Sequence, residues 1–495
     1  MALFQQKKSD TFFLNSKTIV LILIFLTISR IFVLHISPLE LSVDEAQYWD
    51  WSRNLQFGYF SKPPLIAWLI SFSTFVFGSE ELAVRLFSPI LHFLISIILW
   101  IICIKIYGND AGKFAALIWC TLPLTGLGSF IISTDTPLLF FWSLSLLALT
   151  NIIKEKSFIW TILLGVFLGF GFLTKYAMIY FVIFLIIFWL IYDRNKFIKF
   201  YNLILIFILF FLFSLPNIYW NYANEFSTIN HVIYNADLEK INFNFNHVLT
   251  FLISQFFVFG PVTFLIFFFT VWSFFFKEAK LSILAFFSIT IVFALTIQAF
   301  LKTSNANWAV TAYPAACIII AGFLAEKKNK ALRFLINIGI FLNIIISLFV
   351  IKVTLYGDIN PIELKSDPLR KLKGFEVQSR ELTRLINEER PVAIIFNRRS
   401  EITRFNYYMQ KDNVYYNKAY FLTETVIPKN HYEYFFQFKI NDFKSKEKLI
   451  IITREKGIDR KYLDKFESFN LLKISKFKNS KNTYRILYVF KGELR

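Results

Sequence analysis

The sequence predicts a polytopic α-helical membrane protein that ends in a soluble α/β domain. Hydrophobic residues make up 56% of the 495 residues and charged residues only 18%, whereas soluble domains carry roughly 25% charged residues. Several apolar runs exceed the ~18 residues that indicate a transmembrane helix. After about residue 356 these runs stop and charges become dense. We therefore expect a transmembrane domain over 1–355 and a soluble domain over 356–495.

The first domain contains eleven candidate transmembrane spans. If the N-terminus is cytoplasmic, the inner segments carry 16 lysines and arginines and the outer loops carry five, as the positive-inside rule requires. A total of thirteen spans is an alternative, because two further crossings would leave the same loops on the cytoplasmic side. The odd number places the C-terminal domain on the outer face. The expected spans lie near 18–36, 82–104, 113–131, 136–153, 158–173, 176–192, 200–218, 248–276, 281–301, 308–325 and 332–353.

One apolar run, 64–78, is excluded from this count. It is short for a crossing and begins with Pro63-Pro64, so we predict an interfacial or re-entrant segment within a first outer loop over 37–81. The N-terminus is basic and then apolar without a small-residue cleavage site, which is typical of a retained signal anchor. Cys103, Cys120 and Cys317 lie in apolar runs and are expected to be packed thiols rather than disulfides.

The C-terminal domain shows an α/β pattern. Strands are predicted at 391–398 and 448–455 and helices at 379–390 and 402–410, followed by a hairpin that turns at 479–482. The domain carries 29 lysines and arginines against 18 aspartates and glutamates. This basic balance fits either a solvated surface or attraction to anionic membrane lipids. The sequence contains no nucleic-acid-binding motif, and we expect no nucleic-acid partner.

Ionisable residues gather at the outer ends of the expected spans. Asp44, Glu45 and Lys62 lie in the first loop, Asp135 in the turn before the fourth span and Lys175 in the turn before the sixth. Ionisable groups beside membrane segments are expensive unless they are paired or functional. Lys62 and Lys175 are suited to a lipid phosphate, and the carboxylates to a polar sugar group or to general-base catalysis.

Aromatic residues on the same face could contact a sugar ring or an isoprenoid chain. Those we assign to substrate binding are Tyr48, Tyr59, Trp308 and Tyr313. Each feature also has a simpler explanation: aspartates cap helices, lysines at span ends snorkel, and aromatic residues form interfacial belts. His231 and His247 share an outer loop with acidic residues, but their spacing does not diagnose a metal site.

The stretch DEAQYWDWSRNLQFGYFSKPPLIAWL resembles the first outer loop of the GT-C membrane glycosyltransferases. It looks closest to the dolichyl-phosphate-mannose-protein mannosyltransferase-like group that contains the aminoarabinose transferases acting on lipid A. Asp135-Thr136-Pro137 and Gly171 to Lys175 match later elements of that family. The resemblance implies the GT-C fold, with about 11–13 transmembrane helices, in a bacterial inner membrane, with the active site and C-terminal domain in the periplasm.

The resemblance also implies a reaction, the inverting transfer of a sugar from polyprenyl phosphate, of the undecaprenyl type, to lipid A. Asp44, Glu45 and Asp135 would be catalytic, and Lys62 and Lys175 would bind the lipid phosphate. An amino sugar or another modified hexose, such as a uronic acid, is the expected cargo. Protein, lipopolysaccharide core or O-antigen are alternative acceptors. A lipid-linked sugar transporter is a further alternative, although it should show repeats and polar residues at mid-membrane.

Two residues depart from the aminoarabinose transferases. Those enzymes carry glutamate, associated with a metal ion, where this chain has Ser61, and arginine where it has Gln47. The first change leaves the need for a divalent metal open, and we assign no metal ligands. The second removes one phosphate partner. Both changes favour a subgroup that uses a different sugar.

Overall fold

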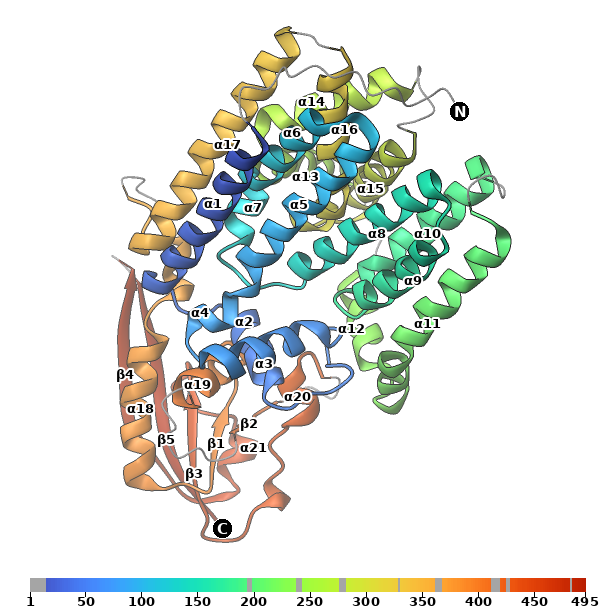
Figure 1. Ribbon diagram of the computed structural model, residues 1–495. Helices are drawn as coiled ribbons and strands as arrows, with labels where there is room; N and C mark the ends of the chain where they lie inside the picture. The colour runs from blue at the N-terminus through green and yellow to red at the C-terminus, as the bar shows by residue number, and fades with distance from the viewer. Residues whose placement is uncertain are drawn as a thin grey trace.

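A computed structural model shows a bundle of long helices with a mixed α/β unit at one end (Figure 1). The structure describes residues 15–193, 198–236, 243–275, 282–327, 330–360, 367–410, 419–423, 428–480 and 483–495. The two parts meet where the first loop of the chain packs against the C-terminal strands and helices. This junction positions the candidate site.

Seven helices of the described chain are long and apolar enough to cross a membrane. Their exposed leucine, isoleucine and phenylalanine side chains would face lipid, whereas their buried residues form the bundle core. They agree with seven of the eleven expected spans. These helices are α1 (Ser16–Ile36), α4 and α5 together (Glu81–Arg85 and Phe87–Tyr107), α8 (Asp135–Glu155), α11 (Phe200–Ala223), α15 (Ser282–Leu301), η3 and α16 together (Ala306–Ala312 and Tyr313–Lys327) and α17 (Lys330–Tyr356).

The expected span 113–131 is interrupted. Helix α6 (Asn109–Thr121) ends before Leu122, and the short α7 (Pro123–Gly128) follows. Leu122 adopts φ −53° and ψ 143°, because a residue that precedes proline is driven out of the helical region. The prediction of one continuous helix was wrong at this point, since hydropathy does not register the break.

The expected span 248–276 is also broken. Helices α13 (Phe245–Val258) and α14 (Pro261–Phe275) are bent by 108° about Gly260. Gly260 has φ +88°, a conformation that favours glycine, and Pro261 lacks the N–H that would continue the helix. The apolar run is therefore two helices rather than the single one predicted.

Two further helices of the bundle are shorter than a crossing requires at ~20 residues. Helix α9 spans Phe158–Phe172. Helix α10 (Ile179–Phe188) lies between a 3₁₀ turn, η1 (Tyr176–Met178), and a π-helical turn, η2 (Trp189–Asp193). The number of crossings beyond the seven long helices stays a prediction.

The first loop, between α1 and α5, is mostly helical. Helix α2 (Val43–Ser52) begins with a capping box in which Ser42 and Glu45 satisfy each other's backbone N–H groups. Helix α3 (Leu65–Phe77) corresponds to the excluded apolar run. Its 13 residues span only about 20 Å. It lies across the end of the long helices (Figure 1), as an interfacial segment would.

The C-terminal part contains one five-stranded sheet in the order β2-β1-β3-β5-β4. Strand β1 is parallel to β2 and β3, whereas β5 is antiparallel to β3 and β4. The predicted strands and helices are confirmed, and the hairpin turns between Ser480 and Thr483, with 481–482 outside the described residues. The elements are η4 (Pro368–Leu372), α18 (Phe375–Glu389), β1 (Ala393–Phe396), α19 (Arg399–Gln410), β2 (Ala419–Phe421), α20 (His431–Phe435), η5 (Ile440–Asp442), β3 (Lys448–Thr453), α21 (Arg460–Leu463), β4 (Phe466–Ser480) and β5 (Thr483–Leu494).

The first loop and the C-terminal part share one hydrophobic core. The ring of Trp49 on α2 meets Tyr407 on α19 edge-on, with centroids 4.9 Å apart. The Tyr408 hydroxyl accepts a hydrogen bond from the backbone N–H of Leu41. Asp50 accepts a 2.6 Å hydrogen bond from the Tyr432 hydroxyl. Helices α19 and α20 are thereby held against the first loop and α2.

Candidate active site

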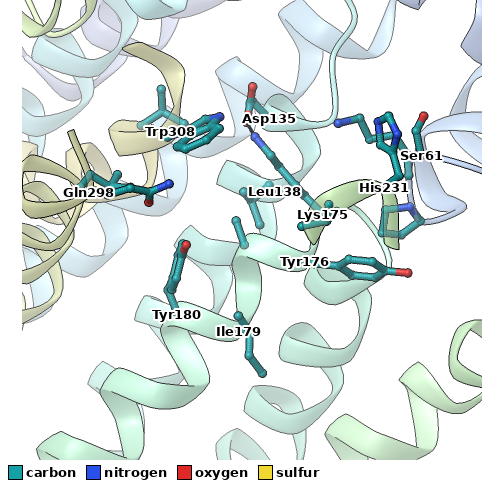
Figure 2. Close-up of a pocket in the computed structure, with 16 residues that line it drawn as sticks. Ser61, Asp135, Leu138, Lys175, Tyr176, Ile179, Tyr180, His231, Gln298 and Trp308 are labelled. Atoms are coloured by element: carbon teal, nitrogen blue, oxygen red, sulfur yellow. Dashed lines mark hydrogen bonds and ion pairs between the residues drawn. The ribbon is translucent and has the colours of Figure 1, made fainter. Parts of the chain in front are cut away.

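A cavity of about 310 Å³ opens at the end of the bundle near the first loop. This volume lies at the lower end of the range of small-molecule sites. Figure 2 shows Asp135 and Lys175 pointing toward each other between Trp308 and Gln298 on one side and His231 and Ser61 on the other. The lining residues are Ser61, Lys62, Pro63, Asp135, Leu138, Lys175, Tyr176, Ala177, Ile179, Tyr180, His231, Val232, Leu295, Gln298, Trp308 and Val310.

Asp135 and Lys175 form the central ion pair. Asp135 is the first residue of α8, where the helix dipole favours a negative charge. Lys175 lies in the extended turn after α9, and its Nζ is 2.6 Å from Asp135 Oδ1. Asn307 donates a 2.8 Å hydrogen bond to the second oxygen, Oδ2. The side chains of Lys175 and Asp135 remain 20% and 13% exposed, so a ligand can reach the pair.

Lys62 brings a second ammonium group to the same cavity. Backbone hydrogen bonds between Tyr59 and Lys62 close a tight turn, and Thr228 Oγ1 donates to the Tyr59 carbonyl. Burial lowers the pKa of Lys62, and the nearby Lys175 lowers it further. No described residue forms an ion pair with Lys62. A partly buried cation beside a like charge is a suitable place for an anion.

Asp44 lies beside this group and pairs with a residue that sequence reasoning missed. Arg399, the first residue of α19, donates from Nη2 to Asp44 Oδ1 and from Nε to Gln47 Oε1. The side chain of Asp44 is 61% exposed. Burial and Lys175 have the largest effects on the pKa of Lys62, which is lowered overall. Asp44 and Asp135 partly oppose this lowering, and Arg399 adds to it. These charged groups therefore form one electrostatic cluster.

Glu45 is not part of this cluster, although it is adjacent to Asp44. Its oxygens accept hydrogen bonds from Arg85 at 2.8 and 3.0 Å and from the backbone N–H groups of Ser42 and Ile132. Burial tends to raise the pKa of Glu45, but Arg85 and these hydrogen bonds outweigh it and lower the pKa. Glu45 therefore holds α2 to α4 and does not line the cavity.

Of the four predicted aromatic residues, one lines the cavity and three are buried elsewhere. Trp308 lines the cavity. Tyr48 is buried, and burial followed by the charge of Asp44 raises the pKa of its hydroxyl. Tyr59 donates to backbone carbonyl groups of the loop. Tyr313 is fully buried, stacks on Phe259 with centroids 4.2 Å apart, and donates to Gln255. Neither Tyr48, Tyr59 nor Tyr313 lines the cavity.

His231 enters the site from α12 (Ser227–Ala236), which sequence analysis treated as an outer loop. Its ring lies 5.2 Å from that of Phe60. Burial, together with the charges of Lys62 and Arg399, lowers the pKa of His231 to about 4. The imidazole is therefore neutral near pH 7.

The cavity offers no evident metal site in the described chain. No three histidine, cysteine, aspartate or glutamate side chains of the described residues come together around one position. Ser61 supplies only a hydroxyl at the cavity wall, and both oxygens of Asp135 are already bound. We therefore derive no reaction step through the divalent ion that the sequence left open.

The chain is similar to known membrane glycosyltransferases. Residues 61–220 match the family model for dolichyl-phosphate-mannose-protein mannosyltransferases. The chain is 30% identical over 419 residues to the lipid A galacturonosyltransferase RgtD of Rhizobium johnstonii, covering 83% of this chain and 86% of that protein.

Solved structures show the same fold. ArnT from Cupriavidus metallidurans, bound to undecaprenyl phosphate, superposes with a TM-score of 0.64 at 13% identity, covering 96% of this chain and 98% of that one. Its apo state gives a TM-score of 0.61 over the same shares of the two chains. The fold is thus a polytopic helical membrane domain with a sheet-containing C-terminal part. On the relationship to RgtD, the chain belongs to the GT-C membrane glycosyltransferases, in the group that contains the lipid A transferases.

Proposed function

We propose that this glycosyltransferase moves a sugar from polyprenyl phosphate, of the undecaprenyl type, to lipid A. The observation that carries the proposal is the convergence of Lys62 and Lys175 with Asp135 in one cavity at the end of the bundle. RgtD acts on lipid A by its name, and ArnT binds undecaprenyl phosphate. The similarity to RgtD supports lipid A as the acceptor, and the similarity to ArnT supports undecaprenyl phosphate as the donor lipid.

In this proposal, the two lysines hold the donor phosphate. Lys62 is the stronger candidate, because no described residue forms an ion pair with it. Lys175 is held by Asp135 at 2.6 Å, so the ammonium is placed before substrate arrives. Preorganised cations of this kind stabilise charge that develops in the transition state.

The transfer step inverts the sugar at its anomeric carbon. An acceptor oxygen attacks this carbon from the face opposite the phosphate, and the bond to the phosphate oxygen breaks. The electron pair leaves with the polyprenyl phosphate, whose added negative charge faces the lysines. If the acceptor is a phosphate oxygen of lipid A, it is already ionised and needs little base catalysis. If the acceptor is a hydroxyl, exposed Asp44 is the candidate base.

Among modified hexoses, we favour a hexuronic acid over an amino sugar. Asp44 and Asp135 are each already paired with a cation, Arg399 and Lys175 respectively. An added amino group would meet the positive charges of Lys62 and Arg399, whereas a sugar carboxylate would be attracted to them. The name of RgtD, a galacturonosyltransferase, supports the same choice.

The proposed location is the bacterial inner membrane with a cytoplasmic N-terminus. The charge bias of the loops then puts the cavity and residues 356–495 in the periplasm. In this arrangement, lipid-linked donor and lipid A both reach the cavity from the outer leaflet.

The test is transfer in vitro by the purified full-length protein. Undecaprenyl phosphate carrying galacturonic acid, galactose or aminoarabinose is mixed with purified lipid A, and the lipid is analysed by mass spectrometry. We expect the mass increase of one hexuronic acid with the first donor. Transfer only to lipopolysaccharide core, O-antigen or protein would reject lipid A as acceptor. Transfer of aminoarabinose alone would reject the choice of sugar.

A further inference from the structure

Arg399 brings the C-terminal part of the chain next to the candidate site. Arg399, Asp44 and Gln47 do not themselves line the cavity. Arg399 opens α19, 355 residues after Asp44 and 352 residues after Gln47, and binds both side chains. The shared core of α2 and α19 fixes this approach. The guanidinium therefore reaches the cluster from a rigid element.

The contacts of Arg399 leave part of its binding capacity unused. A guanidinium has five N–H donors. Nε is directed to Gln47 and Nη2 to Asp44, and no described residue accepts from Nη1. The edge formed by Nε and Nη2 suits a carboxylate or phosphate that binds through two oxygens. Gln47 and Asp44 occupy that edge in this structure.

The exposure of this pair argues against a purely structural role. The Arg399 and Asp44 side chains are 36% and 61% exposed, whereas those of Arg85 and Glu45 are 4% and 1% exposed. An exposed ion pair contributes little to stability. Yet the charge of Arg399 contributes to the lowered pKa of both Lys62 and His231, which line the cavity, so Arg399 lies close enough to act on it.

We propose that Arg399 contacts the substrate and determines specificity by binding an oxyanion of the lipid-linked donor. The oxyanion is either the donor phosphate or the carboxylate of the sugar, and it replaces Asp44 on Nη2. Asp44 is then released toward the acceptor. This proposal rests on the proposed function in one respect: it assumes that the donor is a polyprenyl-phosphate-linked sugar.

The test measures binding of three probes to the full-length protein in detergent: undecaprenyl phosphate, its galacturonic acid derivative and its galactose derivative. Loss of a charge-assisted contact should weaken binding by Arg399→Gln about tenfold or more. Weaker binding of all three probes assigns the contact to the phosphate. Weaker binding of the galacturonic acid derivative alone assigns it to the sugar carboxylate. Binding of every probe within about twofold of the parent overturns the proposal.

Arg398 provides the matched control. It is the preceding residue, it lies 3.5 Å from Glu455, and both of these side chains are exposed. Arg398→Gln removes the same charge from the same domain and should leave the binding of all probes unchanged. Equal weakening by both variants would reduce the effect to general attraction of anions, and it would overturn a specific contact by Arg399.

A compensating variant and a conservative one separate contact from folding. Because Gln47 touches Nε of Arg399, Gln47→Arg in the Arg399→Gln background returns a guanidinium to the cluster and should recover binding. If Arg399→Gln does not fold, Arg399→Lys keeps the charge but loses the planar two-donor edge. Weaker binding by a folded Arg399→Lys supports the contact, and parental binding overturns it.

The outcome remains readable if transfer to lipid A fails, because probe binding needs no acceptor. A parent protein that binds none of the three probes would reject the proposed donor class, and the Arg399 assignment with it. If the parent protein binds the probes and Arg399→Gln binds them with the same affinity, only the Arg399 assignment is overturned.

Discussion

The Glu45–Arg85 pair at the base of the first loop and the Asp135–Lys175 pair in the cavity are both ion pairs between a carboxylate and a cation, but they differ in their surroundings. Glu45 has four hydrogen-bond donors around its two oxygens and is 1% exposed. Asp135 has two donors and remains open to the cavity. A carboxylate whose acceptors are saturated in a sealed site fixes the backbone. One that faces a cavity can exchange partners.

The type and sidedness of a residue therefore do not assign its role. Asp44 and Glu45 are adjacent in the sequence, but successive helical residues point about 100° apart. One therefore faces Arg399 and the other Arg85. If the two pairs differ in this way, substitutions in one should affect stability and substitutions in the other activity.

The largest expected effect is on stability, from Glu45→Ala. The variant leaves Arg85 buried without its carboxylate, which should lower the free energy of unfolding by about 3–5 kcal/mol. Thermal unfolding in detergent measures this. The double variant Glu45→Gln, Arg85→Met should recover part of the stability and the transfer activity, because it removes the orphaned charge but leaves the Leu39 and Glu40 carbonyls without the donors that Arg85 provides. A stable but inactive Glu45→Ala protein would instead support the catalytic role that the sequence led us to expect for Glu45.

The next effect is on activity, from Asp135→Asn. Losing the carboxylate frees Lys175 and should lower transfer about a hundredfold, with little change in melting temperature. Asp110→Asn is a matched control, because Asp110 also lies in the first turn of a helix and pairs with a lysine, Lys113, at 3.1 Å. If Asp135→Asn unfolds like Glu45→Ala, the distinction between the two pairs fails.

A third variant, Lys62→Gln, should weaken donor binding about tenfold. Burial and Lys175 both disfavour the charged form of Lys62, as its lowered pKa indicates. Removing that charge should therefore leave the melting temperature unchanged or raise it, the reverse of Glu45→Ala. Isothermal titration with undecaprenyl phosphate and a melting curve measure the two effects. A lower melting temperature with parental binding would make Lys62 structural.

The smallest effect concerns pH. The folded pKa of His231 is about 4, below its ordinary value of 6.5, so the unfolded chain binds more protons between these values. Its contribution to stability is present above about pH 6.5 and is lost as the pH falls toward 4. The drop in melting temperature from about pH 7 to about pH 5 should be smaller for His231→Gln than for the parent. Equal drops would place the imidazole in open solvent.

Much of the architecture is readable from the sequence because membrane spans and buried strands are continuous apolar runs. Breaks at Leu122-Pro123 and Gly260-Pro261 escape this reading, since they depend on backbone geometry and neighbouring helices. Charge counting also brings Lys62, Asp135, Lys175 and Trp308 to one end of the bundle, where the cavity contains all of them.

The remaining site residues could not be predicted for a different reason. Asn307 and Arg399 reach Asp135 and Asp44 through tertiary packing, and nothing in their local sequence marks them. One signal was available: Gln47 departs from the arginine expected at its position, which indicated a missing cation. The structure brings the guanidinium of Arg399 to Gln47 from the other end of the chain.

The joint core of α2 and α19 has a consequence for how the enzyme is made. Trp49 packs on Tyr407, so the ribosome must add more than 350 residues after Trp49 before its partner exists. At about 5–20 residues per second, the first loop waits on the order of tens of seconds without its cover. The candidate active site is thus completed only when synthesis is nearly finished, and we expect a prematurely terminated chain, although inserted in the bilayer, to be catalytically silent.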